Sequence, residues 1–328
     1  FFWEPSTPEI FLLLGFIPYT LFWIFFLRLS YLDLYFLRAP SSSFYVELGG
    51  GFFVICVWYI LHRKNTNITV SIALFSGILW GSLPFLWSQA IIIEVHGLQS
   101  LFLVLSIWWV WLINQWGKVD FGNHWLFILS FCFGLALGNH ITIVFVLPVI
   151  LLSLFFAYRR GHSIKNILIQ ILLIFCGALI YLYLPVVASQ YPPINWGNPQ
   201  SWQGFFWVVS GDPYQNLLWP SSISLVFSRI SALAGLLLDQ FGIIGVILAV
   251  IGVVQYQHKN KHFPIYLIYL FVIFSFFSIL YATDDSLAYL LMPFLVTTIW
   301  ISLSLDFLYP LKWKKFPVGV VFIVVFVI

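Results

Sequence analysis

Long apolar runs alternate with short polar junctions along the chain. Each run is close in length to a helix that crosses the hydrocarbon core of a bilayer, for which roughly 20 residues are needed. The pattern therefore predicts an all-α polytopic membrane protein with roughly eleven transmembrane helices. The clearest runs cover residues 10–27, 46–61, 68–86, 98–113, 167–184, 241–254, 263–281 and 287–305, and two more flank residues 138–140.

Basic residues gather in four of the short junctions, at residues 63–64, 159–160, 259–261 and 312–315. Short basic loops stay on the cytoplasmic side, and the expected helices place an even number of crossings between these clusters. The same arithmetic assigns five polar segments to the opposite side of the membrane. These are the connector around Asp33, Gln89–His96, Gly138–His140, Pro185–Ser224 and Thr283–Ser286.

Composition excludes a soluble protein. The chain is 62% hydrophobic and 8% charged, with a mean hydropathy of +1.01, and no soluble domain buries so much apolar surface. The net charge of +3 is spread over short clusters that report membrane orientation, so we expect no nucleic-acid partner. Cys56, Cys132 and Cys176 all lie inside apolar runs, where inert buried thiols are the expected state.

The ends of the sequence suggest a piece of a longer protein. The chain begins at Phe1, without a methionine, and stops at Ile328 inside an apolar run too short to span a bilayer. We therefore expect residues 1–328 to form a single transmembrane domain truncated at both ends. Within it, the polar segment 185–224 is expected to be one long non-cytoplasmic loop.

One junction combines four kinds of side chain between two apolar runs: Trp87, Gln89, Glu94 and His96. A carboxylate next to hydrocarbon is costly, so Glu94 marks a candidate functional site. On an unbroken helix, Gln89 and His96 would share a face and Glu94 would point away. The three can serve one site only if the helix breaks between them. The alternative is a helix end at the headgroup layer, with Trp87 as an interfacial anchor.

Two other junctions carry groups able to bind a ligand. In the segment 138–142, which reads Gly-Asn-His-Ile-Thr, His140 is as well suited to cap a turn as to hold a phosphate or orient a carboxylate. Asp284 and Asp285 follow another apolar run. Paired carboxylates bind a divalent cation or share a proton, but aspartate is also a preferred helix cap.

The long polar segment is rich in aromatic residues and in turn-forming proline and glycine. Trp196 and Tyr214 lie among them, beside Asn195. Fixed turns that carry exposed rings suit sugar rings or lipid headgroups. The alternative is an aromatic belt at the membrane interface, which composition by itself favours.

Four ordered stretches together resemble the motifs of a known family. Residues 87–98 resemble W-S-Q-A-x-x-x-E-V-Y-A-L, and residues 138–142 are similar to G-N-H-L-T. Residues 181–199 resemble Y-L-Y-L-P-x-R followed by P-x-N-W-G-D-P, and residues 285–293 resemble D-x-x-x-Y-x-x-P. The family they resemble is a bacterial membrane family of unknown function. It is related to the eukaryotic protein O-mannosyltransferases that act on plexin-type IPT domains, within the GT-C superfamily of polyprenyl-phosphate-sugar glycosyltransferases.

This resemblance implies an inverting transfer in which a carboxylate deprotonates an acceptor hydroxyl and polyprenyl phosphate leaves. The candidate catalytic carboxylates are Glu94, Asp285 and Asp33. The candidate substrate-binding residues are Trp87, Gln89, His96, Asn139, His140, Asn195, Trp196, Tyr214 and Tyr289.

Several positions depart from the family pattern. His96 stands where the family has tyrosine, Asn198 where it has aspartate, and Val187 where it has arginine; the last change weakens phosphate binding at that place. An early acidic motif, D-S-G-E followed by H-P-P-G-Y-P, is not visible before Gly49. Either that loop precedes Phe1, which we favour, or Asp33 replaces it.

The expected partners are membrane lipid, a polyprenyl-phosphate sugar as co-substrate, and an acceptor protein or glycan. No metal-binding residues are assigned, although a divalent cation is a candidate cofactor. The expected location is the bacterial inner membrane, crossed several times. Two other classes of function remain open: a transporter or flippase of lipid-linked saccharide, which needs polar residues near the membrane midplane, and a non-catalytic membrane subunit.

Overall fold

A computed structural model describes residues 68–92, 94–118, 122–218, 222–256, 262–308, 312–313 and 316–317. The two expected spans at residues 10–27 and 46–61, and the connector around Asp33, lie outside these residues. The chain forms two compact units. The first comprises Phe1–Gly97, Ala232–Leu267 and Pro293–Ile328, and the second comprises Leu98–Ser231 and Ile268–Met292.

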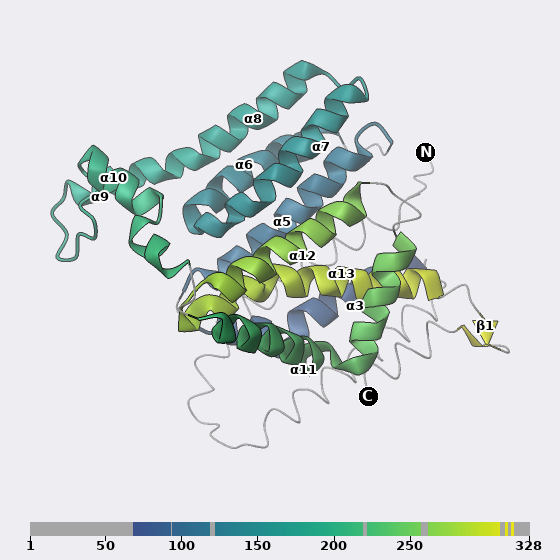
Figure 1. Cartoon of the computed structure of the whole chain (residues 1–328). Helices are drawn as coiled ribbons and strands as arrows, with labels where there is room; N and C mark the ends of the chain where they lie inside the picture. The colour runs from purple at the N-terminus through teal and green to yellow at the C-terminus, as the bar shows by residue number, and fades with distance from the viewer. Residues whose placement is uncertain are drawn as a thin grey trace, which may run out of the picture. The chain divides into compact units, whose positions relative to one another are not determined.

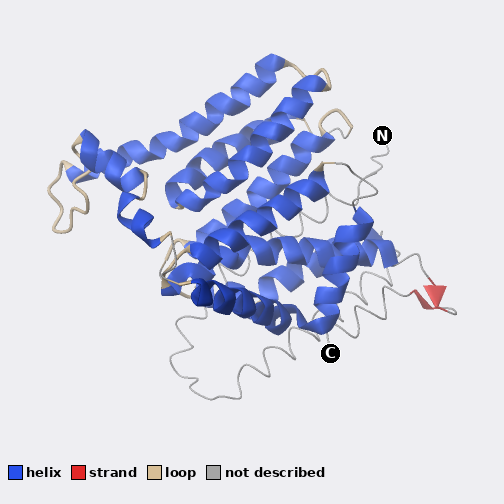
Figure 2. Ribbon diagram, viewed as in Figure 1, coloured by secondary structure: helices blue, strands red, loops and turns tan. Residues whose placement is uncertain are grey.

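Helices account for most of the described residues, and loops and turns for most of the rest, as Figure 2 shows. The structure also contains a short antiparallel pair of strands, β1 (Lys312–Trp313) and β2 (Phe316–Pro317), with Lys312 opposite Pro317. The predicted all-α class is therefore confirmed, apart from this two-residue pairing. A long run of apolar residues favours helices here because a helix satisfies its own backbone hydrogen bonds, which lipid cannot do.

The second unit contains most of the elements drawn in teal and green in Figure 1. Helix α5 (His96–Gln115) begins two residues before this unit. Helices α11 (Ile223–Tyr256) and α12 (Phe263–Leu280) each run through both units, and α13 (Leu291–Leu308) begins in this unit and continues in the first. The elements that lie wholly or mainly in the second unit are α5 (His96–Gln115), α6 (Asn123–Asn139), η2 (Ile141–Val146), α7 (Leu147–Arg159), α8 (Ile164–Ala178), η3 (Leu179–Leu182), α9 (Tyr183–Ala188), α10 (Trp202–Val209), η4 (Asp212–Leu217), α12 (Phe263–Leu280) and η5 (Asp284–Leu290).

The first unit is built from α3 (Ile68–Ser82), α4 (Pro84–Ala90), and the larger parts of α11 (Ile223–Tyr256) and α13 (Leu291–Leu308), together with the start of α12 (Phe263–Leu280). Its close contacts are made by small side chains. The hydroxyl groups of Ser76 in α3 and Ser302 in α13 are hydrogen-bonded to each other. A Cβ added to Gly252 in α11 would collide with the carbonyl group of Trp300 in α13.

Six helices among the described residues are long and apolar enough to cross a membrane, which makes the chain a multi-pass integral membrane protein. They cover His96–Gln115, Ile141–Arg159, Ile164–Ala188, Ile223–Tyr256, Phe263–Leu280 and Ser286–Leu305. The expected total of eleven remains a prediction. Two of the missing spans lie outside the described residues, and α3 and α6, with 15 and 17 residues, are shorter than the others.

Helices α6 and α8 pack against each other at two glycines (Figure 1). A Cβ on Gly134 would collide with the backbone of α8 at Ile174, and a Cβ on Gly177 would collide with the backbone of α6 at Phe131. Small residues are typical of interfaces between membrane helices because they let two backbones approach closely. This contact sets the position of the α6 end, from which the segment 138–142 leaves.

Helix α11 is broken at Gly242, where φ is 62° and ψ is 172°. A positive φ is easily adopted only by glycine. In the sequence, a stretch that contains Arg229 and Asp239 precedes the apolar run expected from residue 241. Both parts are helical, and the change from one to the other coincides with the kink.

Candidate functional site

The junction between α4 and α5 contains Glu94 and His96. Helix α4 ends at Ala90 and α5 begins at His96, so the helix breaks between Gln89 and His96, as the site hypothesis required. His96 Nε2 lies 3.2 Å from Glu94 Oε2. The imidazole is nearly buried, with 10% of its side chain exposed, whereas the carboxylate side chain is 51% exposed. An exposed carboxylate beside an imidazole is accessible to an acceptor hydroxyl.

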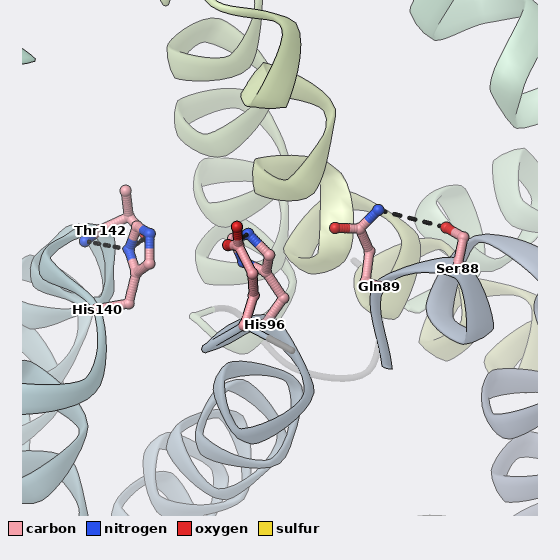
Figure 3. A network of polar contacts seen from close by, with 6 residues as sticks. Ser88, Gln89, His96, His140 and Thr142 are labelled. Carbon is pink, nitrogen blue, oxygen red and sulfur yellow. Dashed lines mark hydrogen bonds and ion pairs between the residues drawn. The ribbon is translucent and has the colours of Figure 1, made fainter. Parts of the chain in front are cut away.

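Trp87 and Gln89 lie on α4, just before this junction. The indole Nε1 of Trp87 donates to the carbonyl oxygen of Gly81 at 2.6 Å. The amide Nε2 of Gln89 donates to Ser88 Oγ at 3.3 Å (Figure 3). The predicted residues Trp87, Gln89, Glu94 and His96 therefore all belong to the first unit.

The segment between α6 and η2 is shaped by His140. Its backbone is extended, with φ −155° and ψ 128°, which ends α6 at Asn139. The ring Nδ1 accepts a hydrogen bond from the backbone N–H of Thr142 at 3.2 Å and lies 2.9 Å from the Thr142 hydroxyl (Figure 3). His140 is thus a cap for η2, one of the two roles open from the sequence. With Nδ1 as acceptor, a neutral ring carries its hydrogen on Nε2.

An aromatic cluster brings this segment next to η5. The ring of His140 lies edge-on to the ring of Tyr289, with centroids 5.5 Å apart. Tyr289 also packs against Phe277 at 4.9 Å and Tyr281 at 5.4 Å. Because Tyr289 and Asp285 belong to the same short helix, η5, two of the predicted motifs are neighbours in the second unit. The side chain of Asp285 lies outside the described residues.

Gln99 is a polar residue of this region that sequence reasoning missed. Its Oε1 accepts a hydrogen bond from Asn139 Nδ2 at 3.2 Å. Gln99 is only 4% exposed, and its Nε2 is buried without a hydrogen-bond partner among the described residues. A buried donor left unpaired costs about 1–3 kcal/mol. The only sequence signal was a glutamine near the start of an apolar helix.

The segment 189–217 is structured by turns and short helices. Gly197 and Asn198 have positive φ values of 68° and 43°, and Asn195 Nδ2 donates to Asn198 Oδ1 at 3.3 Å. Gly204 in α10 packs so closely against this turn that a Cβ there would collide with the carbonyl oxygens of residues 197 and 198. The expected fixed turns are therefore present, although α9, α10 and η4 replace much of the expected loop.

Three rings of this segment form a cluster. Trp196 lies edge-on to Trp207, with centroids 6.0 Å apart, and edge-on to Tyr214, with centroids 5.8 Å apart. Trp196 is 56% exposed and Tyr214 is 44% exposed. The structure thus brings together two predicted substrate-binding residues, Trp196 from a turn and Tyr214 from η4, on a surface that a flat ligand can reach.

Arg229 is a second residue that sequence reasoning missed. Its guanidinium group donates to backbone carbonyl groups at the end of α12 and just beyond it, including that of Thr283 at 3.2 Å. The sequence offered no signal for this, because the acceptors are backbone atoms some fifty residues further along the chain.

The predicted site residues fall into two groups. Asn139, His140, Asn195, Trp196, Tyr214 and Tyr289 belong to the second unit, and the residues around Glu94 belong to the first. Their convergence on a single cavity remains a prediction, and Asp33 lies outside the described residues. Among the residues the structure describes, no group of three or more histidine, cysteine, aspartate or glutamate side chains is placed to hold a metal ion.

Part of the chain matches a model of a known protein family. No curated protein sequence and no solved structure matches the chain. A family model described as the protein O-mannosyl-transferase TMEM260 N-terminal domain matches residues 10–165. This range includes Glu94, His96 and His140, and ends before Trp196 and Asp285. Residues 10–165 are thus similar to the N-terminal domain of the protein O-mannosyl-transferase TMEM260, which supports the predicted relation to protein O-mannosyltransferases.

Proposed function

We propose that this protein transfers a sugar from a polyprenyl phosphate to a serine or threonine hydroxyl of an acceptor protein. In this proposal it is a GT-C-type, inverting, protein O-mannosyltransferase-like enzyme. It works at the non-cytoplasmic face of a membrane, which we take to be the bacterial inner membrane. The similarity of residues 10–165 to a protein O-mannosyl-transferase domain supports the class of reaction.

The contact between His140 and Tyr289 is the observation that carries the proposal. It places the segment that follows α6 beside the short helix that contains Asp285. A group able to donate to a phosphate and a helix that carries a carboxylate thereby become neighbours. Sugar transfer from a lipid phosphate needs both, one to stabilise the leaving group and one to accept a proton.

In the proposed reaction, the acceptor hydroxyl oxygen attacks the anomeric carbon of the sugar. The bond between that carbon and the phosphate oxygen breaks, and its electron pair leaves with the polyprenyl phosphate. The hydroxyl proton passes to a carboxylate, for which Glu94, Asp285 and Asp33 are the candidates. Attack opposite the leaving group inverts the configuration of the anomeric carbon.

The residues around His140 are suited to bind the donor. A neutral His140 with its hydrogen on Nε2 is a donor for a phosphate oxygen. Gln99 Nε2, a buried donor without a partner among the described residues, is suited to a sugar hydroxyl or a phosphate oxygen. We assign the exposed rings of Trp196 and Tyr214 to stacking on the sugar, since flat apolar ring faces bind sugar rings through their C–H groups.

The test is a transfer assay with the full-length protein in liposomes, using a radiolabelled polyprenyl-phosphate mannose and serine- or threonine-containing acceptor peptides. Glu94→Gln keeps the shape of the side chain and removes its charge, so we expect transfer to fall by at least about 100-fold while the protein still inserts. Asp285→Asn tests the second carboxylate in the same way. Asp239→Asn, at an exposed position on α11, is the matched control and should retain full activity.

The rival functions give different results in the same liposomes. A flippase would move the labelled lipid across the membrane without labelling the peptide. A non-catalytic subunit would do neither. A wild-type protein that gives either result, with a range of donor sugars and acceptors, overturns the proposal.

A further inference from the structure

Arg229 joins the beginning of α11 to the end of α12. Its Nη1 donates to the carbonyl oxygens of Ser278 at 3.4 Å and Ile279 at 3.3 Å, and also to that of Tyr281. Its Nη2 donates to the carbonyl oxygen of Thr283 at 3.2 Å. All of these residues belong to the second unit. One side chain therefore holds four carbonyl groups within a stretch of six residues.

This contact extends beyond an ordinary helix cap. Basic side chains often bind the last carbonyl groups of a helix, where orphan acceptors and the helix dipole favour a positive charge. Ser278 and Ile279 lie in the last turn of α12, but Tyr281 and Thr283 lie after it. Arg229 therefore also determines the path of the backbone between α12 and η5.

Two further hydrogen bonds hold the same connection. The backbone N–H of Ala282 donates to the carbonyl oxygen of Leu217, at the end of η4, with a length of 2.7 Å. Ser278 Oγ donates to the carbonyl oxygen of Ser286 at 2.6 Å. The residues between these anchors are Thr283, Asp284 and Asp285, so the backbone that carries both carboxylates is held on either side.

We propose that Arg229 is a positioning residue for transfer: it fixes the backbone of the Asp284–Asp285 turn so that a carboxylate there meets the substrate in a constant place. This inference rests on the proposed function. Arginine suits the task because its planar group presents five N–H donors in a fixed arrangement, whereas lysine offers a single flexible ammonium group. A displacement of about 1 Å in a reacting group is enough to lower a rate on the order of 100-fold.

The experiment compares the wild type with Arg229→Met and Arg229→Lys in the full-length protein in liposomes. Transfer assays give kcat and the KM for polyprenyl-phosphate mannose, and hydrogen exchange reports the order of the backbone at residues 281–290. Arg160→Met is the matched control, because Arg160 also donates to a backbone carbonyl, that of Ile113 at 2.8 Å, but far along the chain from this turn.

We expect Arg229→Met to accelerate exchange at residues 281–290 and to lower kcat roughly 10- to 100-fold, with a KM for the donor within about twofold of wild type. Arg229→Lys should have an exchange rate and a kcat between those of the wild type and Arg229→Met. It replaces the methionine variant if that variant does not fold. Arg160→Met should change neither quantity.

Each of the other outcomes is decisive. Unchanged exchange in the Arg229 variants, or faster exchange with unchanged kcat, overturns the positioning role. A loss confined to the yield of folded protein, with normal kcat in the folded fraction, shows a purely structural contact and overturns it as well. A wild type without transfer overturns the proposed function itself, whereas an active wild type with equally active Arg229 variants overturns this inference alone.

Discussion

His140 and Tyr289 lie edge to face with ring centroids 5.5 Å apart, although they come from two distant segments of the sequence. The same imidazole caps η2 by accepting from the backbone N–H of Thr142. One side chain thus has a local role at the start of a helix and a long-range role in contacting η5. Substitutions that remove one role and keep the other show which of the two roles is required for sugar transfer.

His140→Asn is expected to keep the cap and lose the ring. The Oδ1 of asparagine can take the place of Nδ1, and asparagine is among the best capping residues. We expect a stability close to that of the wild type and transfer reduced at least tenfold. His140→Ala should lose transfer and also about 1 kcal/mol of stability, as cap removal does elsewhere. Thermal unfolding in detergent, measured together with the transfer assay, checks both variants. Normal transfer by His140→Asn would show that His140 acts only as a helix cap.

The aromatic cluster of Trp196, Trp207 and Tyr214 is expected to bind the sugar. Trp196→Ala should raise the KM for polyprenyl-phosphate mannose by about fivefold, as expected for the loss of one stacked ring worth about 1 kcal/mol. Trp202→Ala is the matched control, because Trp202 is a more exposed ring on the same segment, stacked on Phe206 outside the cluster. Equal effects of the two substitutions would contradict sugar binding and support the alternative, an aromatic belt at the membrane interface.

Gly177 should not tolerate even one added carbon. A Cβ there would collide with the backbone of α6, so Gly177→Ala must push α6 and α8 apart. Overpacking of this kind costs about 1–3 kcal/mol. Gly235→Ala in α11 is the control, because a Cβ at that position meets nothing within 4 Å. We expect a lower unfolding temperature for Gly177→Ala and an unchanged or higher one for Gly235→Ala; similar shifts would contradict the close approach of the two helices.

The surroundings of His162 lead us to expect that the folded protein becomes less stable as the pH falls. It lies in the turn after α7 and stacks on Trp116, with ring centroids 4.5 Å apart. Burial, and then the charge of Arg160, lower the pKa of His162, although a hydrogen bond with the backbone of Trp116 opposes them. The folded state therefore favours the neutral ring, and the unfolded chain binds more protons below about pH 6.5.

The sign of the effect follows from this difference in proton binding. The contribution of His162 to stability is complete above about pH 6.5, and it is lost as the pH falls through the lowered pKa of the folded state. The unfolding temperature of the wild type should therefore drop between pH 7.5 and pH 5 by more than that of His162→Gln. Parallel pH profiles for the two proteins would contradict the prediction.

Local features of the sequence were enough to predict the class of the protein and several of its helix ends. Apolar runs predict membrane helices because hydrocarbon leaves a backbone no alternative partner for its polar groups. Polar residues in the middle of such runs marked the breaks at Glu94 and His140, and proline and glycine marked the turns around Trp196. These properties depend on neighbouring residues and on the solvent, so they can be predicted from the sequence.

The pairings within the site were decided only by the tertiary structure. Nothing near Arg229 in the sequence indicates that it binds the carbonyl groups of residues 278–283, because every residue has such a carbonyl group. Gln99 gave no sign that it would be buried beside Asn139 with an unpaired donor. From the sequence, His140 could have faced lipid instead of packing against Tyr289. Such contacts depend on how whole helices pack, and in lipid that packing is set by close fit, as at Gly134 and Gly177, which hydropathy does not record.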